Sequence, residues 1–215
     1  MRHIIIALLF VVILVTGLMQ GQAEEQTNSR YPDIKFGPQF NDKGELKLPV
    51  GFRKWVFIGA PLTPNALNNG VAGFPEFHNV YIEPAAYDYY VKHGSWPEGT
   101  MMVKELQLTK EGSFEDGSRM EPSGRGFFPG TVNGMDVSVK DLKRFADTNG
   151  WGFFNFGHNA PPYIEVAAEA PVETCAGCHM ASAHEDMVFS DFYQQLKPLE
   201  RSTNKHNRDK GSMHK

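Results

Sequence analysis

Short segments rich in aromatic and β-branched side chains recur through the middle of the chain. Glycine, proline and asparagine separate these segments, as they separate the strands of antiparallel sheets. The pattern predicts strands over residues 53–60, 76–82, 101–108, 126–132 and 151–157. In residues 101–108 the alternation is regular, with Met102, Lys104, Leu106 and Leu108 on one face and Met101, Val103, Glu105 and Gln107 on the other.

Three segments carry helical signals instead. Residues 83–94 place Pro84 at a first helical position and Gly94 just after the last one. Residues 136–150 put apolar side chains on one helical stripe, and residues 185–196 repeat them at the same spacing. Together the patterns predict an α+β domain, a predominantly antiparallel β-sheet with a few short helices, the last of them C-terminal.

The first 23 residues have the features of a secretory signal. A basic start at Arg2 precedes a long apolar run, and the small residues Gly21 and Ala23 stand at the cleavage end. An uncleaved membrane anchor is the alternative, but the run is short for a full span. We therefore expect a processed chain outside the cytoplasm, with no stable membrane span.

The rest of the chain divides into three parts. Residues 24–39 are polar and predict a loose leader, residues 40–196 a single domain, and residues 197–215 a disordered basic tail. Without Arg2 the processed chain has 20 basic and 25 acidic side chains, a net charge of −5. A mildly acidic chain is a poor nucleic-acid binder, so we expect no such partner.

The chain's two cysteines stand in the segment "CAGCH", with His179 directly after Cys178. A disulfide over so short a loop stabilises little. A redox dithiol normally follows a βαβ pattern, which is missing before Cys175, and structural zinc needs two further ligands. Covalent c-type haem needs two thiols and an adjacent imidazole for the iron, which Cys175, Cys178 and His179 supply in order. We therefore predict one haem c per chain with His179 on the iron, followed by the helix over 185–196.

The ligand on the other side of the iron stays open. An electron carrier would place methionine or a second histidine there. Histidines 78 and 158, in aromatic strand-like segments, and His184, five residues beyond His179, are read as structural or surface residues. Candidate methionines are Met101, Met102, Met120, Met135, Met180 and Met187.

Lys104 is unexpected because it lies on the more apolar face of its predicted strand. It could lie near the sheet margin and extend its amine to water, as long lysine side chains readily do. Alternatively it could point into the core, where a desolvated amine beside a haem would be a nucleophile. The strand pattern alone leaves both interpretations open.

Several blocks of the sequence resemble the cytochrome P-460 family. They occur in the family's order from about Phe40 to Tyr193: "FNDKGELKLPVGFRKWVFIGAPLTPNALNNG", "VYIEPAAYDYYVKHGSWPEGTMMVKEL", "DVSVKDLKRFA" with "WGFFNF", and "CAGCH" with "DMVFSDFY". The resemblance implies a secreted, periplasmic mono-haem protein with a β-rich fold, usually a homodimer.

In hydroxylamine-oxidising members of that family, the lysine of the "VKEL" block is bonded through its side-chain nitrogen to a meso carbon of the haem. This position falls on Lys104, so the resemblance implies the inward, reactive interpretation. It also implies an enzyme that oxidises hydroxylamine to nitrous oxide, nitrite or both. Hydroxylamine and nitric oxide would be its ligands, and an external electron acceptor, such as a soluble c-type cytochrome, its partner.

The resemblance implies further site residues. Phe74 falls near an aromatic residue of the family's distal pocket, and His78 stands where some relatives carry arginine. Active relatives use a carboxylate shortly before the haem motif as a proton relay. Glu165, Glu169 and Glu173 precede the motif here, and spacing favours Glu169.

Two other functions remain open on the sequence. The sister group, cytochrome c-prime-beta, shares the fold, lacks the lysine cross-link and binds nitric oxide without oxidising hydroxylamine. A plain electron carrier would instead have methionine as the sixth iron ligand. Lys104 favours the enzyme.

Overall fold

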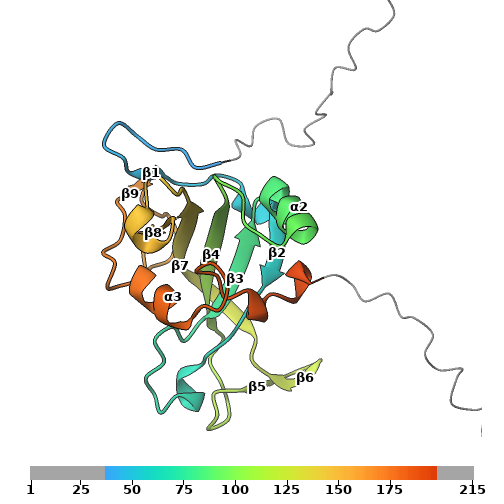
Figure 1. Cartoon of the computed structure of the whole chain (residues 1–215). Coiled ribbons are helices and arrows are strands. Elements are labelled where there is room, and N and C mark those ends of the chain that lie inside the picture. Colours follow the sequence, from blue (N-terminus) through green and yellow to red (C-terminus); the bar gives the residue numbers. More distant parts are fainter. Residues whose placement is uncertain (1–36, 198–215) are drawn as a thin grey trace, which may run out of the picture. The chain divides into compact units, whose positions relative to one another are not determined.

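Five antiparallel strands form the central sheet, in the spatial order β2-β3-β4-β7-β8 (Figure 1). The computed structural model describes residues 37–197. The sheet strands are β2 (Val56–Gly59), β3 (Phe77–Ile82), β4 (Met101–Thr109), β7 (Pro129–Lys140) and β8 (Trp151–Asn155). Two smaller pairs accompany them: β1 (Leu46–Lys47) with β9 (Val166–Ala167), and β5 (Arg119–Glu121) with β6 (Gly124–Gly126).

The helices of the described residues are short. They are α2 (Pro84–His93) and α3 (Ala176–Ser182), with 3-10 helices η1 (Phe52–Lys54), η2 (Asn65–Leu67), η3 (Ala146–Thr148), η4 (Ser190–Phe192) and η5 (Gln194–Leu196). The predicted α+β class, mostly antiparallel sheet with a helix after Cys175, is confirmed. Within residues 37–197 no helix is long and apolar enough to cross a membrane.

Local signals placed the strands and α2 correctly. All five predicted strand segments contain or adjoin strands of the sheet. Helix α2 begins at Pro84 and ends before Gly94, whose φ of 69° is left-handed. The Gly94 N–H donates to the carbonyl of Tyr90 at 2.7 Å and so closes the last turn.

The helix predicted over residues 136–150 is wrong. Strand β7 runs on to Lys140, and only turns and η3 follow before β8. Val137 and Val139 pair with Val103 and Met101 of β4 and also with Phe154 and Gly152 of β8. Two flanking strands therefore decide the conformation of a β-branched segment whose isolated spacing was compatible with a helix.

The helix predicted over residues 185–196 is also wrong in its position and type. Helix α3 lies earlier, and residues 190–196 form the two 3-10 helices η4 and η5. Asp186 and Met187 have φ values of 44° and 64°, and the Val188 N–H donates to the Glu185 carbonyl at 2.9 Å. Two consecutive left-handed residues form a tight turn that a right-handed helix cannot contain.

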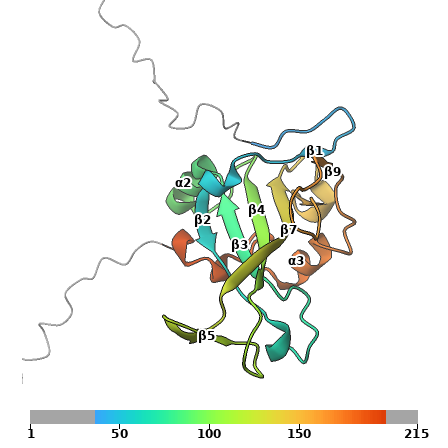
Figure 2. The same ribbon diagram turned by 180° about the vertical axis from the view of Figure 1, so that it is seen from behind.

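The sheet is buried on both faces. On one face α3 and the segment carrying η4 and η5 cover the strands, as both views show (Figures 1 and 2). The cluster there includes Ile58, Val80, Ile82, Met102, Trp151, Phe153, Val188 and Tyr193. The cluster on the other face includes Leu46, Trp55, Met101, Val103, Val137, Phe145 and Phe154. Neighbouring residues of β4 thus enter different clusters, as the alternation predicted.

Three predicted segments lie wholly or mostly outside the described residues. They are the secretory signal (1–23), most of the leader (24–39) and nearly all of the basic tail (197–215).

Glu83, just before α2, gives the fold a specific pH dependence. Burial raises the pKa of its carboxyl to about 7, although the backbone N–H groups of Gly37 and Met101 donate to it and oppose the shift. The folded state therefore binds this proton more tightly than the unfolded chain does. Stability should fall as pH rises from about 4.5 to about 7, by on the order of 3 kcal/mol. Denaturant unfolding of wild type and Glu83→Gln across this range should show a smaller loss in the variant; equal losses would contradict the assignment.

Candidate functional site

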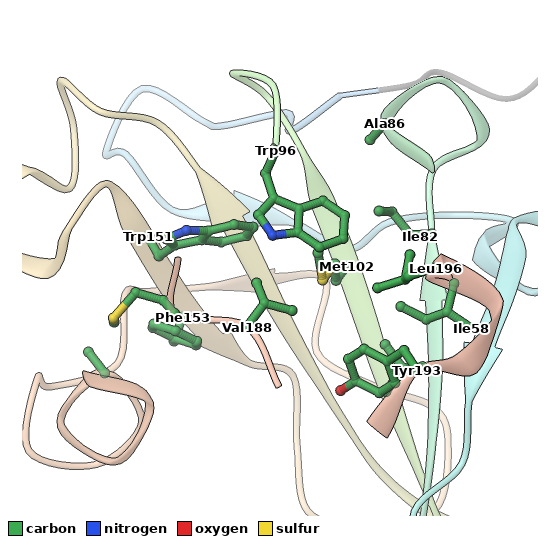
Figure 3. Close-up of a cluster of buried hydrophobic side chains, with 13 residues drawn as sticks. Ile58, Ile82, Ala86, Trp96, Met102, Trp151, Phe153, Val188, Tyr193 and Leu196 are labelled. Atoms are coloured by element: carbon green, nitrogen blue, oxygen red, sulfur yellow. The ribbon is translucent and has the colours of Figure 1, made fainter. Parts of the chain in front are cut away.

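A cavity with about 560 Å³ of empty space, part of it open to solvent, lies between the sheet and the C-terminal segment. The strands contribute Val80, Met102, Lys104, Asp136, Val137, Ser138, Phe153 and Phe154, and the opposite wall consists of Cys175, His179, Met187, Val188, Phe189 and Tyr193. Figure 3 shows Met102, Phe153, Val188 and Tyr193 among the apolar side chains of this region.

The two cysteines lie at the beginning of α3. Cys175 precedes its first residue and lines the cavity, whereas Cys178 lies within the helix and is exposed. Both thiols are free, which disagrees with a disulfide. Among residues 37–197 no group of three or more His, Cys, Asp or Glu side chains could hold a metal ion.

His179, on α3, has one defined proton position. Its Nδ1 lies 2.6 Å from the backbone carbonyl of Met187. A carbonyl oxygen can only accept, so Nδ1 carries the proton and Nε2 keeps its lone pair. Burial lowers the pKa of the ring and so favours its neutral form. The rings of Phe153 and Phe189 pack against it with centroids 4.5 and 4.8 Å away.

These features fit a covalently bound haem. An apolar cavity, two thiols one helical turn apart and an oriented, neutral imidazole are the groups that a c-type attachment uses. The structure brings Cys175 and His179 to one cavity.

The turn that orients His179 is held by two strands of the sheet, β7 and β8. Asp186 and Met187 form its two left-handed residues, and the Met187 carbonyl faces the imidazole. The Asp186 carboxylate forms an ion pair with Lys140, at the end of β7, and accepts from Trp151 Nε1 of β8 at 3.2 Å. The sheet thereby fixes the carbonyl that sets the tautomer and direction of the ring.

Asp186→Ala should destabilise the protein by roughly 2–3 kcal/mol, because it leaves the buried Lys140 ammonium unpaired and puts alanine at a left-handed φ. Thermal unfolding measures this loss. The neutral pair Lys140→Met with Asp186→Asn should recover most of it. The Nδ1 proton resonance of His179 should shift in Asp186→Ala; an unchanged resonance would show that the turn holds without the carboxylate.

Lys104 points into the cavity but is not isolated there. It shares the cavity face of β4 with Met102, and its Nζ lies 2.9 Å from Asp136 Oδ2. The amine also lies 4.1 Å from the ring centroid of Phe74, a cation–π contact. Its side chain is 27% exposed. Lys104 thus lies at the cavity as a partly exposed, ion-paired amine, and its bond to the haem stays a prediction.

Asp136 is a cavity residue that the sequence interpretation missed. It stands directly opposite Lys104 in the β4–β7 ladder and opposite Asn155 in the β7–β8 ladder. Asn155 Nδ2 donates to its Oδ1 at 2.7 Å. The incorrect helix over 136–150 concealed this position, since Asp136 has a cross-strand partner only once β7 is recognised as a strand.

Phe74 and His78 lie together beside Lys104, although neither lines the cavity itself. Their rings are in edge contact at 5.7 Å, and Phe74 lies equally far from the exposed ring of His158. Burial lowers the pKa of His78, and the Lys104 charge adds to this effect. Both effects favour the neutral ring of His78 over its protonated form.

The structure places Glu169 outside the cavity. Its backbone bridges to Phe154 and its side chain is exposed, as are those of Glu165 and Glu173. Partial burial raises the pKa of Glu169, while Arg144 lowers it. Its relay role stays a prediction.

Two candidate methionine ligands lie at the cavity and four lie elsewhere. Met102 and Met187 line it. Met101 and Met135 are buried on the other face of the sheet, and Met120 and Met180 are exposed. His184 is exposed and pairs with Asp191 at 2.9 Å, as expected of a surface histidine.

Comparison with known families identifies one match. The model of the family described as Cytochrome P460 matches residues 49–190, a span that includes Lys104, Asp136, both cysteines and His179. No curated protein matches the chain closely enough to count as a relative.

Proposed function

Because the chain belongs to the cytochrome P460 family, and so is a haem c cytochrome, we propose that it is a secreted, periplasmic enzyme that oxidises hydroxylamine. Lys104 would be bonded to the haem, and the product would be nitrous oxide, nitrite or both. One observation carries the proposal: Lys104 and His179, 75 positions apart, line the same cavity. In family relatives that oxidise hydroxylamine this lysine is bonded to the haem, and the sister group that only binds nitric oxide lacks the bond.

Different residues of the chain would bind different parts of the haem. Cys175 and Cys178 would form the thioethers, and His179 would offer Nε2 to the iron. The bound haem would supply a redox-active iron that accepts electrons from hydroxylamine. Phe153, Phe189 and Val188 would exclude bulk water from one side of the group.

Oxidation to nitrous oxide releases one proton for each electron removed, so the site needs proton acceptors. His78 qualifies because burial keeps its ring neutral beside Lys104 and Phe74. Glu169, implied by the family's relay, would act from the protein surface. An external acceptor, such as a soluble c-type cytochrome, would take the electrons, and a homodimer is the expected assembly.

A nitric-oxide-binding cytochrome of the c-prime-beta type is the second candidate. The observation that favours it is the ion pair between Lys104 and Asp136, which would suit a permanently unlinked lysine. A methionine-ligated carrier has weaker support, since of the methionines within residues 37–197 only Met102 and Met187 line the cavity.

The test uses the purified, haem-loaded protein. Intact mass should show three covalent attachments, and the ferrous spectrum should have a broad, strongly red-shifted Soret band. Hydroxylamine with an artificial electron acceptor should be consumed, with headspace nitrous oxide and dissolved nitrite measured together. Two attachments, an ordinary c-type spectrum and nitric oxide binding without turnover would support the second candidate instead.

A further inference from the structure

The ion pair between Lys104 and Asp136 places a carboxylate beside the nitrogen that would bond to the haem. We propose that Asp136 is the base that deprotonates Lys104 when its side-chain nitrogen bonds to the haem edge. This rests on the proposed function, because it assumes that the bond forms. Asp136 would be a catalytic residue of this modification, since its Oδ2 contacts the reacting nitrogen at 2.9 Å.

The carboxylate is held in place for this role. Strand pairing sets Asp136 opposite both Lys104 and Asn155. The Asn155 amide donates to Oδ1 at 2.7 Å, and its own oxygen accepts from the Gly157 N–H at 3.1 Å. Asn155 therefore occupies one oxygen of Asp136 and leaves Oδ2 for the lysine.

An ammonium group has no lone pair, so Lys104 must lose a proton before its nitrogen can form a bond. That proton passes to Asp136 Oδ2. The new N–C bond then replaces one N–H of the amine and the C–H of a haem meso carbon. These two hydrogens leave with two electrons, which a two-electron oxidant of the peroxide class accepts to become two waters.

Binding of the macrocycle would itself promote the proton transfer. The side chains of Lys104 and Asp136 are 27% and 19% exposed, so water still reaches the pair. An apolar ring over them would remove that water, and a dry environment favours a neutral amine and carboxylic acid over two charges. The neutral amine would also lose its cation–π attraction to Phe74 and become free to move.

Among residues 37–197, Asp136 is the one titratable group that contacts the Lys104 amine. His78 of β3 and His179 of α3 both experience the Lys104 charge, and Glu76, next to β3, acts on His78. Asp136 alone among the described residues is within hydrogen-bonding distance of Nζ.

The test follows bond formation directly. Haem-loaded wild type and Asp136→Asn, prepared without the cross-link, are treated with hydrogen peroxide. Peptide mapping then measures how much of the Lys104 peptide is joined to the haem peptide containing Cys175 and Cys178. At neutral pH the variant should cross-link roughly 100-fold more slowly, the lower end of the range for loss of a positioned base. In strongly alkaline buffer, where lysine loses its proton without help, the variant should approach the wild-type rate.

Asp116→Asn is the matched control, because Asp116 is ion-paired with Arg125 away from the cavity; it should cross-link as wild type does. An Asp136→Asn rate equal to wild type at neutral pH would overturn the proposal. So would a slow rate that alkali does not restore, since that pattern would mean Asp136 only positions the lysine. If wild type never forms the third bond, the Lys104 part of the proposed function fails as well. This outcome differs from failure of the Asp136 proposal alone, in which wild type and Asp136→Asn both form the bond at the same rate.

Discussion

Lys104→Leu should yield a protein that carries haem through two thioethers, has an ordinary c-type spectrum and still binds nitric oxide, but oxidises hydroxylamine at least roughly 100-fold more slowly. That factor corresponds to about 2.7 kcal/mol of lost transition-state stabilisation. The reason is that the third covalent bond, which would distort the macrocycle and alter its electronics, cannot form without the amine. Intact mass, the Soret band and nitrous oxide production measure the three effects.

The leucine should fit the fold, because β4 presents this position beside Met102 and Val80 in an apolar wall. It removes the cationic partner of Asp136, however, and leaves Oδ2 without its hydrogen bond. We expect a stability loss of roughly 1 kcal/mol from this partly exposed pair. The double variant Lys104→Leu with Asp136→Asn removes the unpaired charge and is the control that separates a folding defect from a chemical one.

The double variant should recover stability but not turnover. If Lys104→Leu keeps both the red-shifted band and wild-type turnover, the cross-link assignment fails. Recovery of turnover in the double variant would show that the unpaired charge, not the missing bond, had caused the loss.

Features of the fold that are set by residues close together in the sequence could be predicted from it. The alternation of β4 placed Lys104 and Met102 on one face, and Pro84 and Gly94 bounded α2. The same alternation did not show that the other face is buried too. Glu105 lies there at 4% exposure, because Arg53, 52 positions earlier, donates to both of its carboxylate oxygens. A distant partner of this kind leaves no local pattern.

The residues of the candidate site also fall into two groups: those set by a local motif and those brought together by the fold. Cys175, Cys178 and His179 lie within a motif of five residues, so their chemistry could be predicted without a fold. Asp136 could not, since it reaches Lys104 only through the pairing of β4 with β7. The turn that presents the Met187 carbonyl depends on Lys140 of β7 and Trp151 of β8, which both contact Asp186. Residues that orient and tune the site are thus the ones brought together by tertiary structure.

Removing the cysteine thiols should abolish the thioethers one at a time. Cys175→Ala and Cys178→Ala should each lose one attachment and lower the fraction of protein that carries haem, because each thiol makes one bond. The unloaded fold should change little, within about 0.5 kcal/mol for the exposed Cys178, since neither thiol is in a disulfide. Intact mass and chemical denaturation test these outcomes separately.

The double variant Cys175→Ala with Cys178→Ala tests the third bond by itself. It is loaded with haem and then exposed to peroxide. His179 would still offer Nε2 to the iron, and Lys104 still lies in the cavity wall. Haem that resists extraction by acidified organic solvent should then be attached through Lys104 alone, and adding Lys104→Leu should make all of it extractable. If the double cysteine variant already releases all its haem, Lys104 forms no bond. If the triple variant retains any, another side chain is the attachment point.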